Sequence, residues 1–247
     1  MDERQRMRVA VTGSDGLIGR VLRAGLSERF EPRWLTRADA DITDLPALER
    51  AFAETDAVVH LAATPDVEAV WEDVLPANLI GAYNAFEAAR RAGARRFVFA
   101  SSNHAVGGYM YDDAVFADPE RPMQVGSDLP VRPDSLYGAS KAWGEALGRL
   151  YVEFHGLSVV CLRIGAVTRD DRPPGPAGRR EPPVVANRVQ AMWLSYRDCV
   201  SLVEAALTAD ASFAVVNGVS DNPGRWLGLV DGRQLLGWQP MDGTADA

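Results

Sequence analysis

Short apolar runs rich in β-branched residues alternate along this chain with segments whose apolar residues recur at helical spacing. Short runs that are apolar throughout are typical of strands in a parallel sheet that helices cover on both faces. We predict strands at 9–12, 33–36, 57–61, 96–100, 158–163 and 213–217, and helices at 17–28, 45–53, 67–92, 137–155 and 196–209. The pattern indicates an α/β fold with a doubly wound parallel sheet, in which ligands bind at the carboxyl ends of the strands.

Three glycines, Gly13, Gly16 and Gly19, span the junction between the first predicted strand and the first predicted helix. In such a turn the first glycine permits the tight bend, the second lets a pyrophosphate approach the backbone, and the third lets the helix pack on the strand. The phosphates would then meet the free N–H groups at the positive end of the helix. The spacing and its place in the chain together predict a dinucleotide-binding turn.

Tyr137 and Lys141 lie four residues apart in a segment with helical periodicity, so they share one face of the predicted helix. A nearby ammonium favours the phenolate and lowers the pKa of a tyrosine below its ordinary value of about 10. The pair could act as a general acid and base on a hydroxyl or carbonyl substrate. Alone, the spacing also fits a core tyrosine beside a surface lysine. The nucleotide-binding turn in the same chain favours catalysis.

Composition and charge limit the classes of partner. The chain has 247 residues and a formal net charge of −8, which argues against nucleic acid or an anionic membrane as its main partner. No apolar run has the length of a membrane span, and the charged start predicts no signal peptide. Cys161 and Cys199 are expected to be buried thiols, and with three histidines we expect no metal site. We predict a soluble, cytoplasmic protein.

We predict one domain over residues 1–247, with substrate-side elements at about 166–195 and 218–247. The segment 168–183 breaks the alternation of strands and helices because it is rich in proline, glycine and charge. It must be a loop, and it is long for a compact domain. Two interpretations remain open for it, an ordered lid or a poorly ordered segment.

Five ordered motifs are similar to those of a known superfamily. They are the glycine turn, Asp-Ala-Val-Val-His-Leu-Ala-Ala at 56–63, Asn-Leu-Ile-Gly at 78–81, Phe-Val-Phe-Ala-Ser-Ser at 97–102 and Tyr-Gly-Ala-Ser-Lys at 137–141. In these motifs the chain resembles the short-chain dehydrogenase/reductase superfamily, and in particular its extended, epimerase/dehydratase-like branch. The resemblance implies a Rossmann-type sheet with a small C-terminal substrate-binding extension, bound NAD or NADP, and a homo-oligomer.

By this resemblance, and by the glycine turn, the residues expected to bind the cofactor are Gly13, Ser14, Asp15, Gly16, Leu17, Ile18, Gly19, Arg37, Asp41, Ile42, Leu61, Ala62, Ala63, Asn78, Tyr137 and Lys141. We place Asp41 and Ile42 just after the start of a third short strand, where they resemble the pair that contacts adenine. Asn78 has an alternative interpretation, as a polar group that packs its helix and binds backbone or water. His60 is interpreted as a structural residue lining the cofactor cleft.

A narrower resemblance concerns Ser-Ser-Asn-His at 101–104, Leu-Arg-Ile-Gly at 162–165 and Leu-Leu-Gly-Trp-Gln-Pro at 235–240, which look like bacterial uronate dehydrogenases. Those enzymes oxidise the anomeric hydroxyl of galacturonate or glucuronate to a lactone with NAD. The resemblance implies that Tyr137 is the base, that Lys141 assists it and binds the ribose, and that Ser102 orients the substrate oxygen. Asn103 and His104 would bind sugar hydroxyls.

Arg188 falls near the position whose guanidinium clamps the uronate carboxylate in those enzymes, although it could equally be a solvated loop cation. His104 could likewise be a loop histidine with no substrate contact. Two other functions are kept as alternatives. One is a nucleotide-sugar epimerase or dehydratase, which needs a larger C-terminal domain than the residues after Asn217 supply. The other is a catalytically silent dinucleotide-binding regulator, which would have no need of Tyr137, Lys141 and Ser102 together.

The choice between NAD and NADP depends on the end of the second predicted strand. NAD enzymes usually carry an acidic residue there, and NADP enzymes tend to have an arginine nearby. This chain has Thr36 in the acidic position and Arg37 next to it, which favours NADP, whereas the family resemblance favours NAD. Asp39 is close enough to take the role of the acid after a small shift of the loop.

Overall fold

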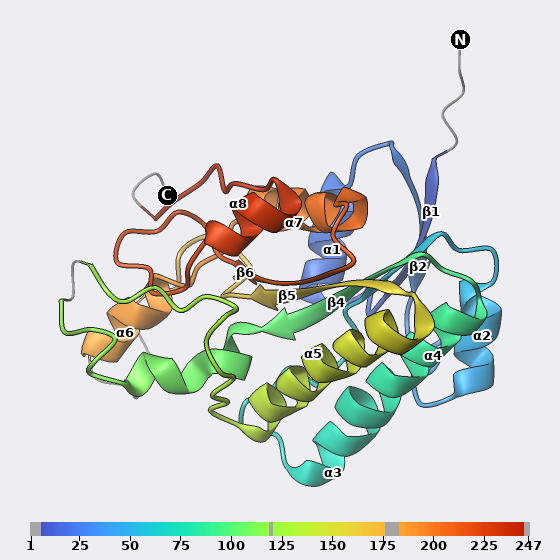
Figure 1. The fold of residues 1–247 in the computed structure, drawn as a ribbon, viewed down its shortest axis with the longest axis horizontal. Helices are drawn as coiled ribbons and strands as arrows, with labels where there is room; N and C mark the ends of the chain where they lie inside the picture. The colour runs from blue at the N-terminus through green and yellow to red at the C-terminus, as the bar shows by residue number, and fades with distance from the viewer. Residues whose placement is uncertain (1–5, 119–120, 176–182, 245–247) are drawn as a thin grey trace.

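A six-stranded sheet forms the centre of the structure, a computed structural model that describes residues 6–118, 121–175 and 183–244 (Figure 1). Its strands are β1 (Met7–Thr12), β2 (Phe30–Leu35), β3 (Ala57–His60), β4 (Arg96–Ser102), β5 (Ser158–Ile164) and β6 (Phe213–Gly218). All neighbours pair in parallel, in the order β2-β1-β3-β4-β5-β6. The chain therefore winds outward from β1 in one direction and from β3 in the other, which places a topological switch point between their carboxyl ends.

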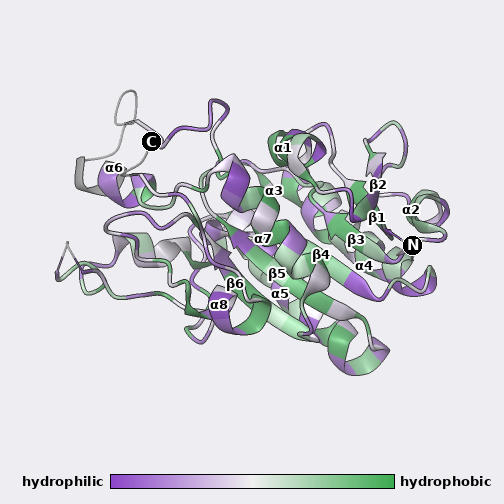
Figure 2. Cartoon of the chain, turned by 90° about the horizontal axis from the view of Figure 1, so that it is seen from above, coloured by the Kyte–Doolittle hydropathy of each residue, from purple (hydrophilic) through white to green (hydrophobic). Residues whose placement is uncertain are grey.

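Helices cover both faces of the sheet, so the predicted Rossmann-type α/β fold is confirmed (Figure 1). On one face lie α1 (Leu17–Gly25) and α7 (Tyr196–Thr208), and on the other lie α2 (Leu45–Phe52), α4 (Gly81–Arg91) and α5 (Leu136–His155). Each layer has its own apolar core, and the strands contribute alternate residues to the two cores. This is why the inner strands, unlike the edge strand β2, are mainly apolar, and Figure 2 shows them as green bands through the middle of the molecule.

Helix α5 packs against the sheet through two of its glycines. A Cβ atom at Gly144 would lie 2.3 Å from Cζ of Phe99 on β4, and one at Gly148 would lie 2.9 Å from Cγ1 of Val159 on β5. Only glycine permits this approach. Tyr137 and Lys141 lie on the same helical face as these glycines, so the short packing distance also sets how deeply their side chains are buried.

Several elements differ from the sequence-based expectations for local reasons. Strand β2 starts at Phe30 rather than at 33 because Pro32 is tolerated on an edge strand. Helix α1 ends at Gly25 because Leu26 is extended and the Ser27 amide donates to Glu204 on α7. The predicted helix 67–92 begins only at residue 71.

That segment is divided into α3 (Trp71–Val74), a π-helix η1 (Leu75–Ile80) and α4. Pro76 lies inside the π-helix and cannot donate a helical hydrogen bond, which explains the departure from α-helical geometry. The 3-10 helix η2 (Asn103–Tyr111), α6 (Pro183–Gln190) and α8 (Val230–Leu236) were not predicted. No helix in the described ranges is long and apolar enough to cross a membrane.

Of the loop predicted at 168–183, residues 168–175 form neither helix nor strand, 176–182 lie outside the described residues, and residue 183 begins α6. Cys161 and Cys199 are buried free thiols, as expected. The third short strand expected just before Asp41 is absent from the described residues 36–44, which form turns between β2 and α2, so that prediction was wrong.

An ion pair between Glu145 on α5 and Arg163 on β5 is buried behind the end of β4. Two hydrogen bonds of 2.9 Å join them, from Nε to Oε1 and from Nη2 to Oε2. The Ser101 hydroxyl also donates to Oε1 at 2.6 Å. Both charged side chains are nearly inaccessible to water. The ion pair and the Ser101 hydroxyl therefore hold α5 against β4 and β5, near the carboxyl ends of these two strands.

Arg163→Met should destabilise the fold by about 3–5 kcal/mol, because it leaves the Glu145 carboxylate buried without its cation. Urea unfolding measures this loss, and adding Glu145→Leu to the same chain should recover much of it. The matched control is Glu153→Gln, which removes the exposed pair with Arg149 and should change stability by less than about 1 kcal/mol. A loss for Arg163→Met as small as that of the control would show that the buried pair does not hold α5 in place.

Candidate active site

A cavity of about 1140 Å³ runs along the carboxyl ends of the strands, across the switch point. At one end, which we call the β1 end, it is lined by the turn after β1 and by the loops after β2 and β3. At the other, the β4 end, it is lined by residues after β4 and β5 and by the first turns of α5. The residues lining the β4 end include Ser102, Asn103, His104, Met110, Asp134, Tyr137, Lys141, Ala166, Val189 and Met192.

The turn at the β1 end fits the pyrophosphate of a dinucleotide. Gly13 has a φ of +66°, and a Cβ there would lie 2.7 Å from the amide nitrogen of Ala62. A Cβ at Gly19 would lie 2.6 Å from the carbonyl oxygen of Gly13. Helix α1 begins at Leu17 with no side-chain cap on its N–H groups, so these donors can face an anion. Of the residues predicted for this turn, only Ser14 is buried away from the cavity.

The loop after β2 carries two carboxylates that are already engaged. Asp39 accepts hydrogen bonds from the Thr36 amide at 2.8 Å and from the Thr36 hydroxyl at 2.7 Å, and it does not line the cavity. Arg37, whose side chain is 87% exposed, pairs with Asp41 at 3.1 Å. Thr36, Arg37, Asp41 and Ile42 all line the cavity. Arg37 and Asp41 therefore border the cavity, whereas Asp39 does not.

Tyr137, Lys141 and Ser102 meet at the β4 end, as the sequence predicted. All three are buried, and the Lys141 ammonium donates to the Ala100 carbonyl on β4 at 2.8 Å. Its nitrogen lies 5.6 Å from the centre of the Tyr137 ring. Burial lowers the pKa of Lys141 from 10.5 to about 8. Lys141 is also the only lysine in the chain, whose other 25 basic residues are arginines.

The pKa of Tyr137 moves in the direction opposite to the prediction. Burial raises it, hydrogen bonding with Ser102 opposes that rise, and the charge of Asp134 adds to it. The expected lowering by Lys141 does not dominate because the ammonium is directed at Ala100. A phenol in this environment keeps its proton to higher pH, and its conjugate base is correspondingly stronger.

Neither Asn78 nor His60 lines the cavity. Asn78, in η1, accepts a hydrogen bond from the Thr64 amide at 2.7 Å and donates to the Ser140 hydroxyl at 3.0 Å, while Ser140 donates to the Tyr137 carbonyl. The structure thus agrees with the packing interpretation of Asn78. His60 bonds to Thr12 at 2.8 Å inside the sheet, and burial lowers its pKa to about 3. It is a core residue and does not reach the cleft surface.

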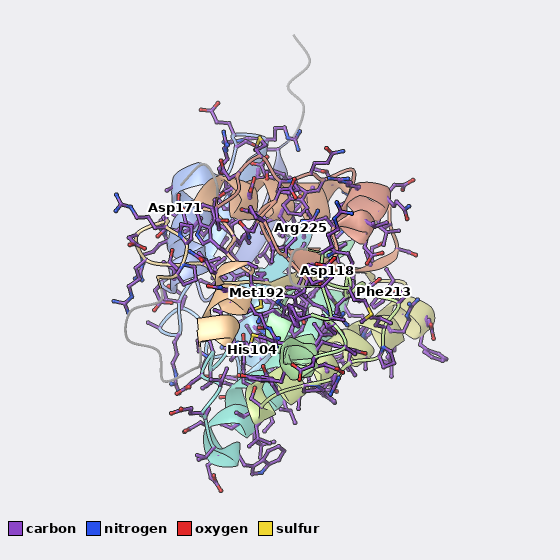
Figure 3. All side chains as sticks on the ribbon, turned by 90° about the vertical axis from the view of Figure 1, so that its left-hand side faces the viewer. His104, Asp118, Asp171, Met192, Phe213 and Arg225 are labelled. Atoms are coloured by element: carbon purple, nitrogen blue, oxygen red, sulfur yellow. The ribbon has the colours of Figure 1, made fainter. Side chains whose placement is uncertain are left out.

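Arg188 is not brought to the cavity. Its guanidinium donates to the Met110 carbonyl at 2.7 Å and stacks 3.8 Å from the centre of the Phe116 ring. The same region brings Met192, just after α6, to the site, where its sulfur lies 3.4 Å from Nδ2 of Asn103. Figure 3 shows Met192 and His104 on the side of the molecule that carries α6. Within the two predicted substrate-side segments, the described residues that line the cavity all belong to 166–195, and none lies in 218–244.

Asp134 is a site residue that the sequence analysis missed. Asp134 lies three residues before Tyr137, and its carboxylate forms a hydrogen bond of 2.8 Å with Nδ1 of His104. The signal was present, because an acidic residue just before the serine cap of a helix is placed beside that helix's first turn. Met110 and Met192 gave no such signal, since apolar side chains at helical spacing indicate core packing.

Comparison with known proteins agrees with this geometry. The model of the NAD-dependent epimerase/dehydratase family matches residues 9–192. An NAD-dependent glucose-6-phosphate dehydrogenase of Haloferax volcanii is 38% identical, over 96% of this chain and 94% of its own length. An L-arabinose 1-dehydrogenase (NAD(P)(+)) of the same organism is 40% identical, over 96% of this chain and 98% of its own.

The fold is also that of a solved relative. The crystal structure of a uronate dehydrogenase mutant from Agrobacterium tumefaciens, complexed with NAD, superposes with a TM-score of 0.76 and 32% identity. It covers 98% of this chain, and the match covers 87% of that structure. These relatives are dehydrogenases that differ in the sugar they are named for, while the cofactor class is the same.

Because Lys141 is the only lysine, isotope-labelled lysine gives a single side-chain signal, which reports its pKa directly. We expect that signal to titrate near pH 8. Between pH 8 and 10.5 the unfolded chain then binds more protons than the folded one, so stability should rise with pH in that window. A Lys141→Met variant should lack the rise and be more stable at pH 7, by on the order of 1–3 kcal/mol. Titration near 10.5 would contradict the burial of the ammonium.

Proposed function

The chain belongs to the NAD-dependent epimerase/dehydratase family, and we propose that it oxidises the anomeric hydroxyl of a hexuronate or related sugar to a lactone. It is an NAD(P)-dependent oxidoreductase, in agreement with its dehydrogenase relatives. The observation that carries the proposal is that Tyr137, Lys141 and Ser102 meet at one end of a cavity whose other end is a glycine cradle. The cavity thus joins a place for a dinucleotide to a place for proton transfer.

The cofactor would be held by the glycine turn and by the residues lining the β1 end. When bound, its nicotinamide supplies the acceptor for the hydride that leaves the anomeric carbon. The turn of Gly13, Gly16 and Gly19 would bind the pyrophosphate through backbone N–H groups, and Leu61, Ala62 and Ala63 would lie along it. Arg37 and Asp41 would face the adenosine ribose.

At the β4 end, Tyr137 would take the proton of the anomeric hydroxyl while Ser102 fixes the orientation of that oxygen. Lys141 would stabilise the phenolate through its charge. Lys141 is the only lysine of the chain, beside 25 arginines. A lysine changes its protonation state readily when buried, whereas an arginine does not. This specialised use supports a chemical role for Lys141 over a packing role.

Asn103 and His104 would bind sugar hydroxyls from the start of η2. A carboxylate clamp by Arg188 requires its guanidinium to leave the Met110 carbonyl, so a uronate is the more demanding substrate for this site. The cytoplasmic location and the homo-oligomeric state stay predictions. The exposed Trp143, Leu150 and Phe154 on α5 support self-association through that helix.

Tyr137→Phe should lower turnover by about 100-fold or more, because it removes the proton acceptor and leaves the cavity shape nearly unchanged. Turnover is followed as nicotinamide reduction with galacturonate, glucuronate and their neutral parent sugars, each with NAD and NADP. Binding of the reduced cofactor, followed by its fluorescence, should stay within about twofold of the wild-type value, because phenylalanine keeps the ring and the pyrophosphate would be held at the β1 end. Full turnover by the variant would refute the assignment. Cofactor binding by the wild type without turnover on any sugar would favour the silent regulator.

Arg37 and Asp41 should control the preference between the two cofactors in opposite directions. Arg37→Ala should weaken NADP binding about tenfold by removing the cation nearest the 2′-phosphate, with little effect on NAD. Asp41→Asn should tighten NADP binding, because it removes a negative charge and releases Arg37 from its ion pair. Dissociation constants for both cofactors in both variants check this. Equal changes for NAD and NADP would show that the pair does not face the 2′ position.

A further inference from the structure

His104 and Asp134 form a hydrogen-bonded pair in the wall of the β4 end. Nδ1 of His104 lies 2.8 Å from Oδ2 of Asp134, and the two side chains are 28% and 11% exposed. His104 follows Ser102 by two residues, and Asp134 precedes Tyr137 by three. The pair therefore joins the segment after β4 to the start of α5, beside both of the groups proposed to act on the substrate oxygen.

The backbone around the pair fixes its arrangement. A Cβ at Gly107 would lie 1.9 Å from Oδ2 of Asp134, and one at Gly138 would lie 2.2 Å from the His104 carbonyl oxygen. Glycine at both positions leaves room for the carboxylate and for the close contact of η2 with α5. The other carboxylate oxygen, Oδ1, accepts a hydrogen bond from the Ser135 hydroxyl at 3.0 Å. Asp134 is thus held from two sides.

The contact with Asp134 determines which imidazole nitrogen of His104 carries the proton. An ionised carboxylate only accepts hydrogen bonds, so the short contact requires the proton to be on Nδ1 of His104. In the neutral ring Nε2 then carries a lone pair and acts as an acceptor. A carboxylate partner also strengthens the acceptor on the far side of an imidazole, as it does for histidines that bind metals.

The ring also lies next to Tyr137. The two ring centres are 5.8 Å apart with an interplanar angle of 61°, and the His104 backbone amide donates to the Ser102 hydroxyl at 3.2 Å. His104 lines the same cavity as Ser102 and Tyr137, so a sugar with one oxygen between those two would present its other hydroxyls on the side of the imidazole. Such a hydroxyl carries a proton to donate, which matches an acceptor at Nε2.

We propose that Asp134 is a positioning residue that holds His104 in its Nδ1-protonated tautomer, so that Nε2 accepts a hydrogen bond from a substrate hydroxyl. The hydroxyl contact rests on the proposed sugar oxidation, but the tautomer does not. This tautomer makes the β4 end prefer a group that donates a hydrogen bond to Nε2. A sugar hydroxyl can donate one, whereas an ionised carboxylate cannot. Asp134 acts through His104 and does not itself touch the substrate.

The tautomer is measured without any ligand. The chain has three histidines, and the ¹⁵N shifts of imidazole nitrogens distinguish protonated from unprotonated atoms. In the pH range where the ring is neutral, we expect a protonated Nδ1 and an unprotonated Nε2 for His104, whose signals are identified by their loss in His104→Gln. Asp134→Ala should abolish this preference. A protonated Nε2 in the wild type, or an identical pattern in Asp134→Ala, overturns the proposal.

Asp134 could matter only because it precedes the cap of α5, and Ser135→Ala is the control for that role. Ser135 accepts from the Gly138 amide at 3.0 Å, so this variant removes the helix cap and the second bond of Asp134 while the contact with His104 stays. We expect it to lower the melting temperature but to retain the wild-type tautomer. If Ser135→Ala changes the tautomer as much as Asp134→Ala does, the effect belongs to the helix end, and the positioning role is overturned.

The substrate contact is tested with whichever sugar supports turnover. Asp134→Ala should raise KM about tenfold, which corresponds to the loss of one hydrogen bond, with a smaller change in kcat. Asp134→Asn keeps an acceptor oxygen and should recover part of the loss, and cofactor affinity should be unchanged in both variants. An unaltered KM with an altered tautomer refutes the hydroxyl contact. Absence of turnover in the wild type refutes the proposed function and with it this contact, while the tautomer result stands by itself.

Discussion

The short distance between α5 and the sheet is the constraint on which the rest of the site depends. Gly144 and Gly148 remove the side chains that would keep the helix away from Phe99 and Val159. Tyr137, Lys141 and Glu145 lie on the same helical face, so they are pressed against the end of β4 and lose contact with water. Without this close packing the same i, i+4 spacing would give a tyrosine and a lysine at the surface.

Two charged side chains, Glu145 and Lys141, are buried on the same face of α5, and they have unequal sets of partners. Glu145 has a full partner in Arg163 and an additional donor in Ser101, so its charge is well satisfied. Lys141 donates to the Ala100 carbonyl, but burial still lowers its pKa to about 8. An ammonium that is weakly held and near its titration point is costly for folding and suited to acid-base chemistry. Structural support and chemical reactivity are thus assigned to neighbouring turns of the same helix.

Much of the architecture could be predicted because burial on both faces imposes continuous apolar strands, and the six strands were found with shifts of only a few residues at their ends. The glycine turn and the meeting of Tyr137, Lys141 and Ser102 followed from spacing and from the common edge of parallel strands. The 3-10 helix at Asn103–Tyr111 could not be predicted in this way, because its two glycines and short length hide any helical period.

Properties that depend on depth or on long-range contacts were also out of reach. Spacing places Lys141 beside Tyr137, but the direction of the Tyr137 pKa depends on burial and on Asp134, which lie outside any i, i+4 rule. Arg188 was chosen by its resemblance to a motif position, and its actual partners, the Met110 carbonyl, the Asp113 carboxylate and the Phe116 ring, lie more than seventy residues earlier. Similarly, Asn78 reaches Tyr137 only through Ser140.

The proposed function depends on oxidation at the anomeric carbon, which a sugar labelled with ¹³C at that carbon reports. The protein is incubated with the labelled sugar and an excess of oxidised cofactor, and the products are followed by ¹³C NMR from the first minutes. We predict that the label appears first as a lactone carbonyl, in step with reduced cofactor, and later as the open-chain acid. A labelled carbon that remains an acetal while another carbon is oxidised or inverted would contradict the claim and favour the epimerase alternative.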